Sequence, residues 1–167
     1  MLTDHYQQAS ARIYRNLERI CEGYQSLWGD DMAVRVYHSM HDTDAPNAVA
    51  LLGYPTDIQT EPTATGFACS QQFTVRVYVR TTHSDEAVCR SRASHLVEAL
   101  QLMAIADPKL GYTVHRCVAD VPEWQFGTDN SKLSTTVARI DFRCTVVTQN
   151  ISEISALIAD DDEEDTE

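Results

Sequence analysis

The sequence predicts an α+β domain in which a mixed or antiparallel sheet of about five strands has two main helices packed on one face. Two observations predict it. Apolar residues alternate with polar ones in several stretches, as in half-buried strands, and recur every three or four residues in two others, as in amphipathic helices. The length of 167 residues suits one domain with a sizeable core. We therefore expect a single domain over residues 1–158 and an acidic, disordered tail over residues 159–167.

The first helix is expected over residues 4–27. Its apolar residues step by three or four along one side; they are Tyr6, Ala9, Ile13, Leu17, Ile20, Tyr24 and Leu27. Asp4, with Gln7 three residues later, resembles a capping box, and Gly29 stands where the helix should stop. A helix of this kind needs a sheet or another helix against its apolar side.

Two strands are expected next, over residues 33–38 and 48–54, and we expect them to pair as an antiparallel hairpin with a long loop. Residues 55–70 follow, with two prolines, four threonines and little periodicity. Long segments without a pattern are uncommon inside compact domains and are usually functional or disordered. We therefore interpret Pro55–Ser70 as a projecting arm.

The central unit of the chain is the stretch 72–103, which reads as a strand, a turn and a helix. Apolar residues occupy every second position from Phe73 to Val79, so one face of this strand belongs to the core. Ser84 is the expected helix cap, and the two acids after it suit the positive end of the helix dipole. The helix is expected to run to about Ala104, before Asp107-Pro108.

The last part of the domain is expected to add two strands. One covers residues 112–118, and a loop over residues 120–134 with two aromatic residues follows it. The final strand, around residues 138–146, alternates like Phe73–Val79, so we expect these two strands to be neighbours. Residues 151–158 suit a short amphipathic turn.

The formal charge of −12 is unevenly distributed, because seven acids fall in residues 160–167. The body has 13 basic and 18 acidic residues, and no basic groove of the kind that binds a phosphate backbone is expected. No apolar run approaches the ~20 residues that cross a bilayer, and the N-terminus does not resemble a secretory signal. We therefore expect a cytoplasmic protein with no membrane association.

Candidate chemical sites are weak in this sequence. The five cysteines have no close pairing, so we expect reduced thiols rather than a disulfide framework or a zinc site. His38 and His41 lack the further ligands of a metal site. No spacing links His83, His95 or His115 to a nucleophile. We expect no enzyme, metal or cofactor.

The sequence supports an interaction surface better than it supports any of these chemical sites. If the two long strands are neighbours, one sheet face carries Arg76, Tyr78, Arg80, Arg139 and Arg143 beside Asp141. Arginine and tyrosine are favoured at interfaces, and the aromatics Trp124 and Phe126 of the following loop also suit docking on a neighbour. The alternative is a solvated face with cross-strand ion pairs, each of which contributes little. Both interpretations stay open at this point.

The order of elements resembles the tail terminator, or tail completion, proteins of long-tailed bacteriophages. The likeness is clearest in the second half, in QFTVRVYVRTTHSDEAVCRSRASHLVEAL, DPKLGYTVHRCVADV and LSTTVARIDFRCTVV. These stretches are similar to that family's strand and helix start, its D-x-x-L-G turn into a strand, and its closing strand.

The resemblance implies a structural virion protein without catalysis. Such a protein forms a ring, commonly a hexamer, on the last ring of tail-tube protein and joins it to the head connector, while DNA passes without specific binding. It is found in the host cytoplasm during assembly and then in the virion. Two alternatives remain: another phage neck or head-completion protein, and a small cellular α+β binding module or enzyme using a groove beside His95 and His115.

Overall fold

The computed structural model describes residues 2–28, 34–38, 46–52, 54–64, 68–128 and 132–148. Within them the chain forms two helices and one mixed sheet of seven strands, which confirms the α+β class but not the count of five strands. The elements are α1 (Leu2–Trp28), β1 (Arg35–Tyr37), β2 (Asn47–Leu51), β3 (Thr56–Pro62), β4 (Cys69–His83), α2 (Glu86–Ala106), β5 (Arg116–Ala119), β6 (Glu123–Thr128) and β7 (Ser134–Thr148).

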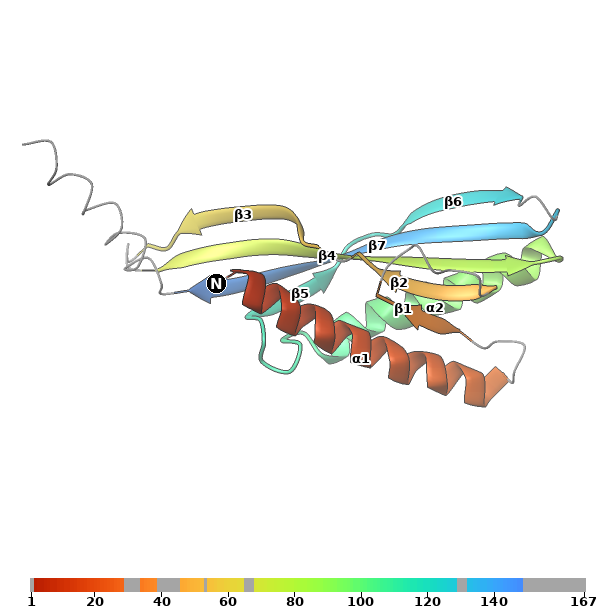
Figure 1. Ribbon diagram of the computed structural model, residues 1–167, viewed down its shortest axis with the longest axis horizontal. Coiled ribbons are helices and arrows are strands. Elements are labelled where there is room, and N and C mark those ends of the chain that lie inside the picture. Colours follow the sequence, from red (N-terminus) through yellow and green to blue (C-terminus); the bar gives the residue numbers. More distant parts are fainter. Residues whose placement is uncertain are drawn as a thin grey trace, which may run out of the picture.

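Two long strands form the spine of the sheet. β4 and β7 have 15 residues each and pair antiparallel over their whole length, from Cys69 opposite Thr148 to His83 opposite Ser134. The prediction that these two strands are neighbours in the sheet is confirmed. Short strands flank each half of the spine: β3 and β5 at one end, and β2, β1 and β6 at the other (Figure 1).

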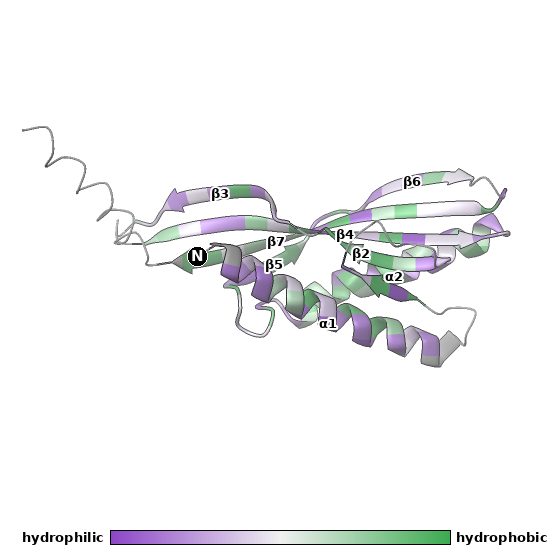
Figure 2. Cartoon of the chain, in the orientation of Figure 1, coloured by the Kyte–Doolittle hydropathy of each residue, from purple (hydrophilic) through white to green (hydrophobic). Residues whose placement is uncertain are grey.

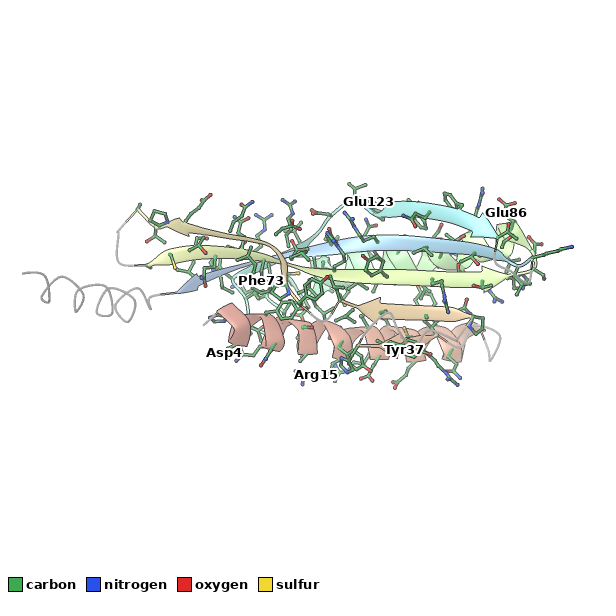
Figure 3. The ribbon with its side chains drawn as sticks, turned by 45° about the horizontal axis from the view of Figure 1, so that its top comes forward. Asp4, Arg15, Tyr37, Phe73, Glu86 and Glu123 are labelled. Carbon is green, nitrogen blue, oxygen red and sulfur yellow. The ribbon has the colours of Figure 1, made fainter. Side chains whose placement is uncertain are left out.

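The core lies between the sheet and the two helices, which both pack on one face of it (Figure 1). Alternate residues of the spine point to this side and are fully or almost fully buried; they are Phe73, Val75, Val77, Val79, Ala138, Ile140, Phe142, Cys144 and Val146. Phe73 lies between the sheet and α1 (Figure 3), and its ring meets that of Tyr6 edge to face at 5.9 Å.

The first helix follows its predicted apolar side. Tyr6, Ala9, Ile13 and Leu17 are buried, and hydrophilic and hydrophobic residues alternate around α1 (Figure 2). The prediction of a cap at Asp4 was wrong, because α1 already begins at Leu2 and Asp4 lies in its first turn. A carboxylate there still favours the helix through its dipole.

The second helix begins one residue later than predicted. Its cap is Asp85, not Ser84, because Asp85 has extended backbone angles and its carboxylate accepts hydrogen bonds from the N–H groups of Ala87 (2.8 Å) and Val88 (3.3 Å). His83 Nδ1 accepts the N–H of Asp85 at 2.9 Å, which fixes the turn. The helix ends at Ala106, close to the predicted stop before Asp107-Pro108.

Pairing around β2 and β3 corrects two further predictions. β1 runs parallel to β2, so the two do not form an antiparallel hairpin; β2 instead pairs antiparallel with β4. The expected arm Pro55–Ser70 contains β3, which pairs with the first half of β4. β3 shows no apolar alternation because nearly all of its residues are exposed. Its backbone hydrogen bonds join it to the sheet, together with a long ion pair of 3.9 Å from Asp57 to Arg76 of β4.

The segment before β7 corrects two more predictions. β5 begins at Arg116 rather than Tyr112, since Leu110, Gly111 and Tyr112 have positive φ angles and form a turn. The expected loop 120–134 contains β6, which pairs with the first half of β7 and is exposed along its whole length. As in β3, an edge strand without a buried side gives no periodic signal.

All five cysteines are free, as predicted, and four of them are buried. Burial raises the pKa of Cys21 to about 12, so this thiol is unreactive at neutral pH. The predicted turn over residues 151–158 and the acidic tail over residues 159–167 lie outside the described residues.

We predict that Phe142→Ala lowers the free energy of unfolding by about 3–5 kcal/mol, the usual range for a large core aromatic. Phe142 is fully buried, and its removal leaves a cavity in the core between the sheet and the helices. Urea unfolding followed by circular dichroism measures the effect. Val147→Ala, on an exposed position of the same strand, is the control and should change stability by less than ~0.5 kcal/mol. Equal effects of the two substitutions would contradict this placement of the core.

Candidate functional site

The sheet face turned away from the helices, here called the open face, carries the predicted arginine cluster. Arg76 of β4 stands opposite Asp141 of β7. Its guanidinium binds that carboxylate through two hydrogen bonds, Nε to Oδ1 at 2.8 Å and Nη2 to Oδ2 at 2.9 Å. Both side chains are less than a fifth exposed. The hydrogen bonds from Arg76 to Asp141 raise the pKa of Arg76, so the guanidinium stays charged.

The two predicted arginines of β7 are also paired within the chain. Arg139 Nη2 lies 2.7 Å from Glu123 of β6 and 3.5 Å from Asp141. Arg143 binds Asp120, which precedes β6, at 2.7 Å. The open face is therefore a network of alternating charges, and its arginines already have acidic partners in the same molecule.

Tyr78 and Arg80 lie on the open face too, and both are half-buried. They stand opposite Ala50 and Ala48 of β2, whose small side chains are themselves buried. The structure thus brings together the five predicted residues of β4 and β7.

The predicted aromatics belong to the other side of the sheet. Trp124 and Phe126 of β6 stand opposite Ala138 and Thr136 of β7, whose side chains face the helices. They are 36% and 56% exposed, and their rings stack 6.2 Å apart. The guanidinium of Arg90 from α2 lies 4.5 Å from the centre of the Phe126 ring.

Two cavities lie beside the end of β6. A cavity of about 280 Å³ is lined by Gln125, Thr135 and Val137 beside Gly127. A second, of about 250 Å³, lies between Gly127 and the start of α2 and is lined by Arg90 and Phe126. We call β6 with these two hollows the aromatic edge. It presents backbone, aromatic surface and the ion pair of Arg90 with Glu86 to solvent.

A third surface feature lies between the helices and is here called the helix groove. It has a volume of about 430 Å³ and an apolar lining; its lining residues are Arg12, Asn16, Arg19, Ile20, Ala99, Leu102, Met103, Ala106 and Asp107. Asp107 closes one end, where Arg12 Nε donates to it at 2.8 Å and Asn16 Nδ2 at 3.1 Å.

Comparison of the sequence with protein-family models and with curated proteins finds no match. Neither described helix has the length and apolarity that crossing a membrane requires. Among the described residues, no three His, Cys, Asp or Glu side chains are grouped to hold a metal ion. His95 and His115, which one alternative placed beside a groove, are exposed and line none of the three cavities described above.

Sequence reasoning did not find the acidic partners of the open face or the helix groove. Asp120 and Glu123 fell in a predicted loop, and only the register of β6 against β7 brings Glu123 to Arg139. Leu102 and Ile105 are the only signal for the groove, since their apolar side chains fall on an exposed side of α2.

We predict that Arg76→Met destabilises the fold by roughly 2 kcal/mol, between the values for exposed and buried ion pairs. The substitution leaves the carboxylate of Asp141 half-enclosed without its main partner. Arg76→Met combined with Asp141→Leu should recover most of the loss, because no unpaired charge remains. Chemical denaturation of both single variants and the double variant measures the coupling. Additive losses would contradict a coupled pair.

We predict a pH-dependent contribution from Asp107. Burial by itself raises the pKa of this carboxyl, but hydrogen bonds from Arg12, the Gly111 N–H and Asn16 outweigh burial and lower it below its ordinary 3.8. A lowered pKa stabilises the fold above pH 3.8, and the contribution is lost as the pH falls through the folded-state value. Asp107→Asn should therefore lower the melting temperature at neutral pH, and the gap should narrow below pH 3.8. A gap that stays constant with pH would contradict this assignment.

Proposed function

We propose that this protein is a structural, non-catalytic subunit of the bacteriophage tail-terminator kind, which assembles into a ring through the exposed edges of its sheet. The observation that carries the proposal is the pair of exposed edge strands, β3 and β6. Each pairs with one spine strand alone, and they flank opposite edges at opposite ends of the spine. Exposed edges of this length readily accept a further strand.

A ring requires two different surfaces of one subunit to meet, and the contact must recur with the same rotation until it closes. β3 and β6 are different in chemistry as well as position. β3 exposes Ile58 and the acidic Glu61, whereas the aromatic edge exposes Phe126, over which lies Arg90, itself bound to Glu86 of the same chain. Because β-branched and aromatic side chains on neighbouring strands pack well against each other, Ile58 of one subunit and Phe126 of the next are a complementary pair. We propose that β3 of one subunit extends the sheet at β6 of the next.

The paired charges of the open face fit the role of a ring subunit, because they would keep the sheet rigid. Because Arg76, Arg139 and Arg143 are each held by an acid of the same chain, the spine keeps its shape without a partner. In the proposed assembly the ring, of six subunits, caps the tail-tube protein and offers its other side to the head connector. An acidic body would let DNA pass through the ring without binding. The ring would assemble in the host cytoplasm and remain in the virion.

We predict that Ile58→Lys in β3 and Phe126→Lys in β6 each convert rings to monomers, because a charge placed on an edge strand opposes strand addition. Size-exclusion chromatography with light scattering and negative-stain electron microscopy measure the assembly. An equal mixture of the two variants should form dimers that do not grow. In the mixture one intact β6 edge can meet one intact β3 edge, while the other two edges are blocked.

The matched control is Tyr112→Lys, at a highly exposed aromatic position in the turn before β5. It should assemble like the unsubstituted chain. Melting temperatures of all three variants show whether each one folds. A chain that stays monomeric at high concentration, or a mixture of variants that remains monomeric, would contradict the proposed ring contact.

A further inference from the structure

The helix groove leaves apolar surface uncovered on the side of the molecule opposite the open face. Within and beside it, Leu102 is 56% exposed and Ile105 is 75% exposed, although both belong to a long, well-packed helix. Met103 and Ile20 form the groove's floor and wall. Elongated apolar grooves between two helices are the usual seat of a short amphipathic segment.

The α1 side of the groove is basic. Arg12, Arg15 and Arg19 follow one another at spacings of three and four, so they share one side of the helix. Arg12 is occupied by Asp107. Arg15 and Arg19 are exposed and form no ion pair within the described residues, and Arg15 projects from the side of α1 away from the sheet (Figure 3).

One acid shares this side of α1, since the exposed Glu22 follows Arg19 by three residues, and the other nearby acids lie elsewhere on the two helices. Glu18 lies close to Tyr14, on the side of α1 that turns to β1. Glu98 lies near Tyr24, toward the far end of α1. With Arg15 and Arg19 exposed beside the single acid Glu22, the rim keeps a net positive charge beside the apolar lining of the groove. A peptide segment that complements this surface would have a row of apolar residues followed by acidic residues.

The chain's own C-terminal sequence has this composition. Ile151, Ile154, Leu157 and Ile158 recur at helical spacing, and residues 160–167 contain seven acids and no base. These seven acids account for more than half of the formal net charge of −12. No other stretch of the sequence joins an apolar row to an acidic run in this way.

The strand that precedes this C-terminal segment also ends within reach of the helix groove. β7 ends at Thr148, and in Figure 1 this end lies beside the start of α1. Ten further residues span about 15 Å as a helix and about 33 Å when extended. The distance along α1 from Tyr6 to Arg19 is about 20 Å at the helical rise. Residues 151–158 can therefore reach the groove of the same molecule.

We propose that the helix groove binds the C-terminal segment of its own chain, with the apolar row of residues 151–158 against Leu102 and Met103 and the acidic run over Arg15 and Arg19. This intramolecular contact covers the apolar surface that the two helices leave open. It does not depend on the ring proposed above, because the β3 and β6 edges lie on other parts of the molecule. It is sensitive to salt, since part of it is a contact between surface charges.

The test places the photo-crosslinking residue benzoylphenylalanine at position 157 of the full chain and maps its products by mass spectrometry. We expect crosslinks to Met103 and its neighbours in α2, within species that migrate as single chains on denaturing gels. Arg15→Glu with Arg19→Glu should reduce the yield about fivefold, a change that two surface ion pairs can produce. Arg116→Glu is the matched control and should leave the yield unchanged, because this exposed arginine of β5 stands opposite Thr145 and so faces the open side of the sheet.

Raising the salt concentration on the unsubstituted chain is the second arm and should lower the yield without any mutation. Crosslinks that fall outside α1 and α2 would overturn the proposal. Products found only between two chains would assign the segment to another copy and overturn the intramolecular contact. Equal yields in the α1 double variant and in the Arg116→Glu control would overturn the role of the basic rim.

Discussion

The pairing of β4 with β7 along fifteen residues each is the constraint on which the rest of the structure depends. β2, β3, β5 and β6 each pair with one half of it, β1 joins the sheet through β2, and both helices pack on one of its faces. Because the register is continuous, every residue of the spine has a fixed side. A shift by one residue would carry Phe73 and Phe142 to the open face and the arginines into the core. The burial of those rings and the charges on the other face therefore specify the same register.

The two faces of the spine are stabilised by different physical means. On the helix side, dense packing of apolar side chains removes surface from water. On the open face the same strands carry Arg76, Arg139 and Arg143, each paired with an acid that a neighbouring strand or loop supplies. Such pairs contribute little individually, yet unpaired charges at the partly buried positions of Arg76 and Arg139 would be costly. The open face thus needs no partner to be stable, while its charge pattern disfavours incorrect strand pairing.

The sequence was sufficient to predict the elements that bury one of their sides. It was insufficient to predict the elements that bury neither side. Phe73–Val79 and the stripe from Tyr6 to Leu17 were predicted because burial imposes a period of 2 or 3.6 on apolar residues. β3 and β6 were taken for loops because their residues are exposed on both sides, and only long-range backbone pairing makes them strands. The alternation along the spine also placed the predicted arginines on one face correctly. Their partners Asp120 and Glu123 were not found, because they lie just before and within β6, which was expected to be a loop.

These differences bear on how a second molecule would recognise this one. An arginine that already binds an acid of its own chain must lose that partner before it can serve a neighbour, so it gives an interface little net free energy. Backbone groups at an exposed strand edge exchange only water for a new partner, and an exposed aromatic gains by leaving water. Recognition is therefore expected to depend more on the edges, above all Phe126 and the backbone of β6, than on the charged centre of the sheet. The spine fixes where those edges lie, and the edges carry the surface that a neighbour can use.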